Sequence, residues 1–147
     1  MEININTPAI LFPAISLIML AYTNRFLALS NRIRNLHERY EKGEKQEILH
    51  GQIKNLRYRL NIIKNMQALG VISFIGSILC MYFIYIEWME FAHAVFAFSL
   101  ITFSLSLLLS LLEIQKSTKA LELELSDMEG LEDPSMVDYI RNKFNRD

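Results

Sequence analysis

Hydrophobic residues concentrate in three long stretches that contain no Asp, Glu, Lys or Arg, namely residues 3–24, 66–86 and 91–112. About 20 apolar residues, at a helical rise of about 1.5 Å each, span the roughly 30 Å hydrocarbon core of a bilayer. A soluble helical bundle would need a polar face on each helix, and the third stretch offers only hydroxyl groups there. The pattern predicts an all-α integral membrane protein with three transmembrane helices, at residues 7–24, 66–86 and 91–112.

The polar segment between the first two spans has the periodicity of a helical hairpin. Apolar residues recur three and four positions apart on both limbs, at positions 26, 29, 33, 36 and 40 and then at 49, 53, 56, 60 and 63. This spacing is the a/d seam of a coiled coil. Gly43 predicts a turn near residues 42–44. Residues 25–65 are therefore expected to extend helices one and two out of the membrane as an antiparallel coiled hairpin.

Helical signals also lie beyond the third span and before the first. Ile114, Leu121, Leu125 and Met128 keep one register, so residues 113–129 are expected to extend helix three alongside the hairpin. Gly130 is expected to end that helix, and Asp133-Pro134-Ser135 to begin a short amphipathic helix in the 130–147 tail. Thr7-Pro8 predicts the start of the first span, and Pro13 a kink within it.

Charge is distributed unevenly between the two connections. Residues 25–64 contain ten Lys or Arg against four Glu, whereas the predicted outer turn at 87–90 contains two Glu and no basic residue. Short basic loops stay in the cytoplasm, so we expect the N-terminus outside and both the hairpin and the C-terminus inside. A secretory signal peptide is the alternative for residues 3–24, but Glu2 and the absence of a preceding basic residue favour a retained span. The net charge of −1 gives no indication of nucleic-acid binding.

Four polar residues are expected at similar depth at the inner membrane boundary: Asn24, Arg25, Gln67 and Glu113. A charge at this level needs a partner or a route to water. Arg25 and Glu113 are the obvious pair, acting as a structural clamp. The alternative is that each side chain extends independently into the headgroups.

Small and hydroxyl side chains recur along the spans. A polar stripe of Ser99, Thr102, Ser106 and Ser110 shares one face of the third span, and Gly70, Ser73, Gly76, Ser77 and Cys80 fall near one face of the second. One interpretation is close helix packing, with hydroxyls hydrogen bonding between helices. The other is that the third-span stripe lines a polar path through an oligomer, since three helices alone cannot enclose a pore.

Candidate catalytic or metal-binding chemistry is sparse. Glu87, Glu90 and His93 recur three apart and could bind a divalent cation or respond to pH, although exposed polar residues at a helix start explain them equally well. The sequence has no HExxH motif, nucleophile elbow or glycine-rich phosphate loop, and its one cysteine, Cys80, lies within a span. We therefore expect neither catalysis nor a cofactor.

Three segments resemble an uncharacterised family of small bacterial membrane proteins. They are TPAILFPAISLIMLAYTNRFLALSNRIRNLH at 7–37, MQALGVISF at 66–74 and SLLLSLLEIQKSTKALELELSD at 106–127. The resemblance implies a three-span protein of the bacterial plasma (inner) membrane with a cytoplasmic helical section, and it brings no activity. By resemblance, the motif includes Pro13, Tyr22, Asn24, Arg25 and Glu113.

Two functional hypotheses follow. The first is a non-enzymatic homo-oligomer in the lipid bilayer, in its most concrete form an ion-conducting one. The alternative is a membrane-anchored scaffold or regulator whose cytoplasmic stalk binds a cytosolic protein. A small-solute transporter ranks third, because only Pro13 suggests the broken helix that such a site needs.

Overall fold

The structure is a computed structural model that describes the backbone of residues 2–43 and 46–144 and the side chains of residues 2–43, 46–119, 121 and 122. Over this described backbone, every regular element is an α-helix. The helices are α1 (Asn6–Ala9), α2 (Leu11–Glu41), α3 (Gln46–Tyr85) and α4 (Met89–Phe144). The predicted all-helical class is confirmed.

Three helical segments are long and apolar enough to cross a membrane. They are Asn6–Glu41, Gln46–Tyr85 and Met89–Lys119. Their most apolar windows are only partly buried within the chain, between 11% and 33% of the residues. Large aliphatic side chains therefore face outward along each span, as expected where lipid rather than water is the surrounding solvent. The chain is a multi-pass membrane protein by this criterion.

The first span is interrupted at Ile10, between α1 and α2. Pro13 has no N–H to donate to the carbonyl group of Ala9, so the regular hydrogen-bond pattern cannot pass through this point. The helix also begins slightly earlier than the Thr7-Pro8 signal predicts. The Oδ1 atom of Asn4 accepts a hydrogen bond from the backbone N–H of Asn6 (3.1 Å).

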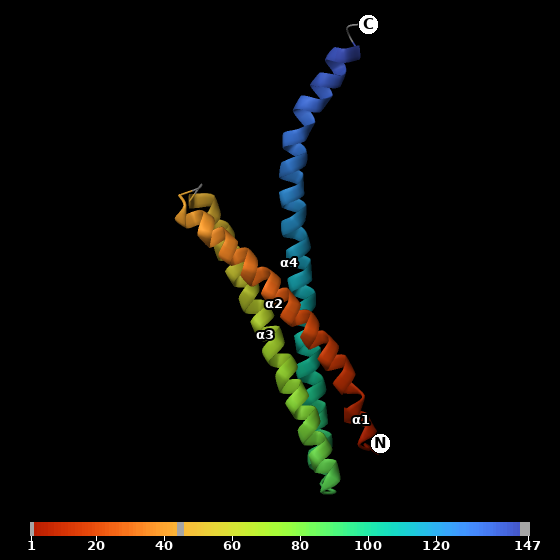
Figure 1. Cartoon of the computed structure of the whole chain (residues 1–147). Helices are drawn as coiled ribbons and strands as arrows, with labels where there is room; N and C mark the ends of the chain where they lie inside the picture. Colours follow the sequence, from red (N-terminus) through yellow and green to blue (C-terminus); the bar gives the residue numbers. More distant parts are fainter. Residues whose placement is uncertain (1, 44–45, 145–147) are drawn as a thin grey trace. The chain divides into compact units, whose positions relative to one another are not determined.

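Helices α2 and α3 run antiparallel beside each other as a hairpin (Figure 1). Between them, Gly43 has φ +81°, the left-handed conformation that glycine adopts readily just beyond a helix end. Four of the ten residues of the predicted apolar seam are buried, Leu29, Leu49, Leu56 and Ile63, and the other six are partly exposed. Supercoiling of this hairpin and its location in the cytoplasm remain predictions.

A tight turn connects α3 to α4. Glu87 has φ +64°, and the backbone N–H of Trp88 donates to the carbonyl group of Phe83 (3.0 Å). Aromatic rings surround the turn: Phe83 stacks on Trp88 with centroids 6.4 Å apart, and Phe91 lies 5.5 Å from Trp88. Exposed Trp and Tyr side chains are typical of the membrane–water interface.

Helix α4 departs from the sequence-based expectation at its C-terminal end. We expected Gly130 to end the helix and a separate short helix to follow, but α4 continues to Phe144. One glycine costs a helix only about 1 kcal/mol relative to alanine, and Pro134 removes one backbone hydrogen bond. Neither is enough to end this helix. The side chains of the amphipathic tail lie outside the described set.

The chain forms two compact units, Met1–Leu111 and Leu112–Asp147. In the first unit, α2, α3 and the beginning of α4 pack together. A cluster of buried apolar residues joins Tyr22, Leu29, Leu56, Ile63 and Met66, each at most 7% exposed. The predicted packing of residues 113–129 alongside the hairpin remains a prediction.

Candidate functional site

A buried cluster of three serines joins the second and third spans. We call Ser73, Ser77 and Ser99 the serine seam; all three are fully buried. The Oγ of Ser99 lies 2.6 Å from the carbonyl oxygen of Ser73, and the Oγ of Ser73 lies 2.8 Å from the carbonyl oxygen of Ser99. The Oγ of Ser77 lies 2.9 Å from that of Ser99. These bonds satisfy hydroxyls that lipid could not.

Two glycines allow the helices to approach closely at this level. A Cβ added at Gly76 would lie 3.1 Å from the Cβ of Ser99, and one at Gly70 would lie 2.7 Å from the sulfur of Met19. The first contact is with the short, buried side chain of Ser99, which has little freedom to move. Gly76 therefore sets the separation of α3 and α4 at the serine seam.

Closer to the end of the spans from which the hairpin extends, Ser106 joins α2, α3 and α4. Its Oγ donates to the carbonyl oxygen of Met66 on α3 (2.8 Å) and lies 3.3 Å from the phenol oxygen of Tyr22 on α2. Tyr22 is only 2% exposed, so its ring fills the centre of the helix packing. The structure thereby gives Tyr22 a packing role that periodicity alone did not identify.

The predicted polar stripe of the third span thus faces the interior of its own chain. Ser99, Thr102 and Ser106 are buried, at 0%, 6% and 0% exposure. Thr102 hydrogen bonds to the backbone carbonyl of Phe98 in its own helix, and Ser110 is the acceptor for Arg25. Within the described part of the chain, no side-chain polar atom is both buried and without a hydrogen-bond partner. These contacts favour the helix-packing interpretation.

The four residues predicted at the inner boundary have different surroundings. Arg25 Nη1 donates to Ser110 Oγ at 3.4 Å, a long bond between α2 and α4. Gln67 Nε2 donates to Thr23 Oγ1 (3.2 Å), whereas the side chain of Asn24 is exposed. Glu113 has a buried side chain in the second unit, and its predicted pairing with Arg25 remains a prediction. Sequence reasoning missed Ser110 as a partner of Arg25.

Glu87, Glu90 and His93 lie at the α3–α4 turn and the beginning of α4. Among the residues whose side chains are described, no group of three or more His, Cys, Asp or Glu is arranged to hold a metal ion. His93 Nδ1 instead lies 2.6 Å from the carbonyl oxygen of Met89, one turn earlier on α4. That contact matches the simpler explanation of a polar residue at a helix start.

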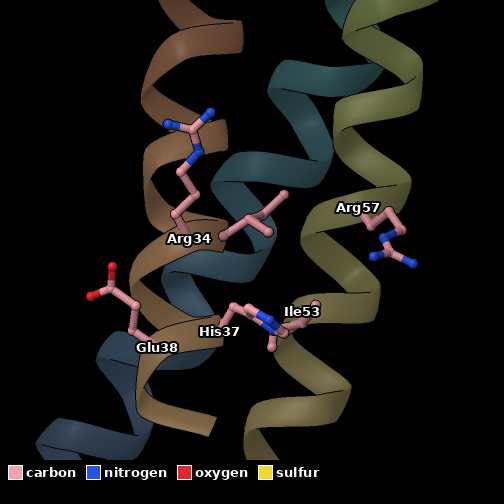
Figure 2. Close-up of a pocket in the computed structure, with 6 residues that line it drawn as sticks. Arg34, His37, Glu38, Ile53 and Arg57 are labelled. Carbon is pink, nitrogen blue, oxygen red and sulfur yellow. The ribbon is translucent and has the colours of Figure 1, made fainter. Parts of the chain in front are cut away.

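A second polar feature lies on the α2–α3 hairpin. An open groove of about 340 Å³ runs between the helices and is lined by Ile33, Arg34, His37, Glu38, Ile53 and Arg57. Figure 2 shows His37 beside Ile53 between the two helices, with Glu38 and Arg57 pointing to opposite sides. We call these six residues the hairpin groove.

The apolar part of the hairpin groove is half-buried. Ile33 and Ile53 are partly exposed, whereas Leu29 and Leu56, from the same heptad seam, are 7% exposed. Two helices cover each other's seam from one side only, so a strip of apolar surface remains open. Sequence reasoning identified the apolar seam but did not place His37 beside it. Its position in the groove depends on the rotation of α2 against α3.

A comparison with protein families accounts for most of the chain. Residues 5–123 match the family described as protein of unknown function (DUF2721). The chain belongs to the DUF2721 family. No curated protein and no solved structure matches it.

The DUF2721 region contains the serine seam, the Tyr22–Ser106 contact and the whole hairpin groove. The predicted resemblance is therefore confirmed at the level of the family. Residues 124–147 lie outside the DUF2721 match. The family description assigns no activity, so the function has to be argued from the geometry of these features.

Proposed function

We propose that this DUF2721 protein is a non-enzymatic, membrane-anchored scaffold whose α2–α3 hairpin binds a cytosolic protein. The observation that carries the proposal is the hairpin groove, an open strip of half-buried apolar surface bordered by exposed arginines. Exposed apolar surface with a polar border is typical of protein-binding sites. In this proposal the three spans hold the hairpin at a fixed place on the membrane.

The orientation is part of the proposal. The ten basic residues of positions 25–64 support a location of the hairpin in the cytoplasm, with the N-terminus on the outer side of the bacterial plasma membrane. The exposed aromatic residues of the α3–α4 turn, Trp88 among them, suit the opposite interface. Reporter fusions at both ends of the chain test this orientation.

Site-specific photo-crosslinking tests the scaffold itself. A photoreactive amino acid replaces Ile53 in the groove or, as the control, Asn55, which is exposed and lies about 200° further around the helix. The proposal predicts a discrete crosslinked protein from position 53 and none from position 55 in native membranes. Equal crosslinking from both positions, or none from either, would contradict it.

Self-association is a second candidate, and one observation favours it. The outward face of α2 carries exposed small residues at heptad spacing, Ala14, Ala21 and Ala28, with the exposed amide of Asn24 between them. Small residues let membrane helices approach, and an amide can both donate to and accept from its copy across a two-fold axis. A cysteine at Ala21 should form a disulfide with a second copy, whereas one at the outward Ile75 of α3 should not.

Ion conduction receives less support than self-association. The residues first assigned to a path, Ser99 and Ser106, are fully buried and hydrogen bonded to α3. A conducting oligomer would need a different lining, built from outward faces that are mainly aliphatic. Flux measurements on the purified protein in liposomes test it, and a clear conductance would favour this candidate over the scaffold.

A further inference from the structure

The size and shape of the hairpin groove suit the side chains of another protein better than a small molecule. Its volume of about 340 Å³ lies at the lower end of ligand pockets, and it is open along the hairpin instead of enclosed. Ile33 and Ile53 line the groove and can contact the apolar face of another helix. Amphipathic helices bind in hydrophobic grooves in this way.

The charged residues around the groove indicate which charges the bound helix should carry. Arg34 on α2 and Arg57 on α3 are both exposed, and neither makes a hydrogen bond or ion pair with another described residue. Glu38 is the one carboxylate that lines the groove. His37 lies 3.3 Å from Glu41, so that contact lies within α2. Within the described part of the chain, these two guanidinium groups are therefore available for carboxylates on the partner.

The distance of the hairpin groove from the membrane surface favours a protein as the partner over lipid headgroups. Ile33 and His37 lie eight and twelve residues beyond Arg25, which corresponds to about 12 to 18 Å along α2. The headgroup layer adds only about 5 to 8 Å beyond the hydrocarbon core on each side. With Arg25 at the inner boundary, the groove lies beyond the headgroups.

We propose that the hairpin groove binds an acidic amphipathic helix of a partner protein, with its apolar face on Ile33 and Ile53 and its carboxylates beside Arg34 and Arg57. This inference rests on the proposed scaffold function and specifies the class of partner. Because Arg34 and Arg57 flank the apolar contact, acidic residues on both sides of the helix's apolar stripe are required. An uncharged helix of the same shape would lose both arginine contacts.

The test uses the full chain in nanodiscs of neutral lipid. The probe is a labelled helical peptide with leucines at a and d and glutamates at e and g, and the control peptide has glutamine at each glutamate position. Binding is followed by fluorescence anisotropy at low and at high salt. We expect the glutamate peptide to bind at least about tenfold more tightly than the glutamine peptide at low salt, with the difference shrinking at high salt.

Substitutions in the chain test whether the peptide binds at the hairpin groove. The Arg34→Glu/Arg57→Glu double substitution should remove the preference for the glutamate peptide, whereas Arg32→Glu/Lys54→Glu, the same charge change elsewhere on the hairpin, should retain it. Ile53→Asn should weaken the binding of both peptides. The circular dichroism spectrum of this variant is compared with that of the parent chain to check that it folds. Equal affinity for the two peptides, or a preference that survives the Arg34→Glu/Arg57→Glu change, would overturn the inference.

Two further outcomes also count against the inference. Tighter peptide binding after deletion of residues 130–147 would make the chain's own C-terminal segment the occupant, and weaker binding of both peptides when anionic lipid replaces neutral lipid in the nanodiscs would make lipid headgroups the occupant. The scaffold proposal is judged separately. If position 53 crosslinks a protein while no acidic preference exists, the scaffold stands and the acidic class of partner is wrong.

Discussion

Ser99 and Ser73 form a reciprocal pair across the second and third spans, in which each hydroxyl lies within 2.8 Å of the other residue's carbonyl oxygen. Both residues are fully buried. The pair ties α4 to α3 within the apolar part of both candidate spans, where neither water nor lipid can supply an alternative partner. The spans are therefore joined to one another by polar contacts within a single chain.

Replacing Ser99 by alanine should weaken the helix packing. The substitution removes the hydroxyl shared by Ser73 and Ser77, and hydrogen bonds between membrane helices average about 0.6 kcal/mol with a maximum near 1.7. We expect a loss of stability in that range, measured by unfolding in mixed micelles. Ser104→Ala is the matched control, because Ser104 is exposed on the same helix. An equal effect of the two substitutions would refute the role given to Ser99.

Gly76 should tolerate a larger side chain poorly. An added Cβ would lie 3.1 Å from the Cβ of Ser99, and valine would add two further methyl groups there. We expect Gly76→Val to lower the free energy of unfolding by about 1–3 kcal/mol through overpacking. Gly51→Ala is the control, since no heavy atom lies within 4 Å of its added Cβ. Its helical position should make that change neutral or stabilising by up to about 1 kcal/mol. A fully stable Gly76→Val variant would contradict the close approach.

Tyr22 should contribute through its ring far more than through its hydroxyl group. Both contacts between Tyr22 and Ser106 are 3.3 Å long, whereas the ring is almost completely buried. We expect Tyr22→Phe to cost less than about 1 kcal/mol and Tyr22→Ala about 3–5 kcal/mol. Thermal unfolding in detergent, followed by circular dichroism, checks both values. A large loss in the phenylalanine variant would give the hydrogen bond the greater role.

Much of the fold could be predicted because its signal is local in the sequence. A stretch of about 20 residues without a charge is decisive, since each charged group at the bilayer centre costs several kcal/mol. The heptad seam of the hairpin likewise follows from spacing alone, and Leu29, Leu56 and Ile63 are indeed buried. Gly43 has the positive φ of a turn at its expected place.

The partners of individual polar groups could not be predicted in this way. Whether Arg25 lies against Ser110, or Asn24 faces outward, depends on the rotation and depth of each helix relative to its neighbours. The continuation of α4 through Gly130 was missed for a different reason. Glycine and proline signals are penalties of limited size, which a long helix can absorb.

The hairpin core should be stabilised mainly by the four buried residues of the apolar seam. Ile63 is 1% exposed, whereas Ile48 on the same helix is 60% exposed. Truncation of Ile63 to alanine should therefore cost about 2–5 kcal/mol, and truncation of Ile48 less than about 0.5 kcal/mol. Hydrogen exchange of the hairpin amides in nanodiscs measures the difference. Similar protection in both variants would show that the seam does not hold the hairpin.

The polar residues of the third span hold the helices together inside each chain, and this packing supports our proposal that the hairpin carries the function. Reaction of a single cysteine with a charged, membrane-impermeant thiol reagent, added to both sides of the membrane, tests it most directly. In a Cys80→Ser background, Ser106→Cys, at a buried position, is compared with Glu87→Cys, at an exposed position in the α3–α4 turn. We expect rapid modification at position 87 and none at position 106 under native conditions. Modification of position 106 at a comparable rate would contradict this packing, because water would then reach the serine face.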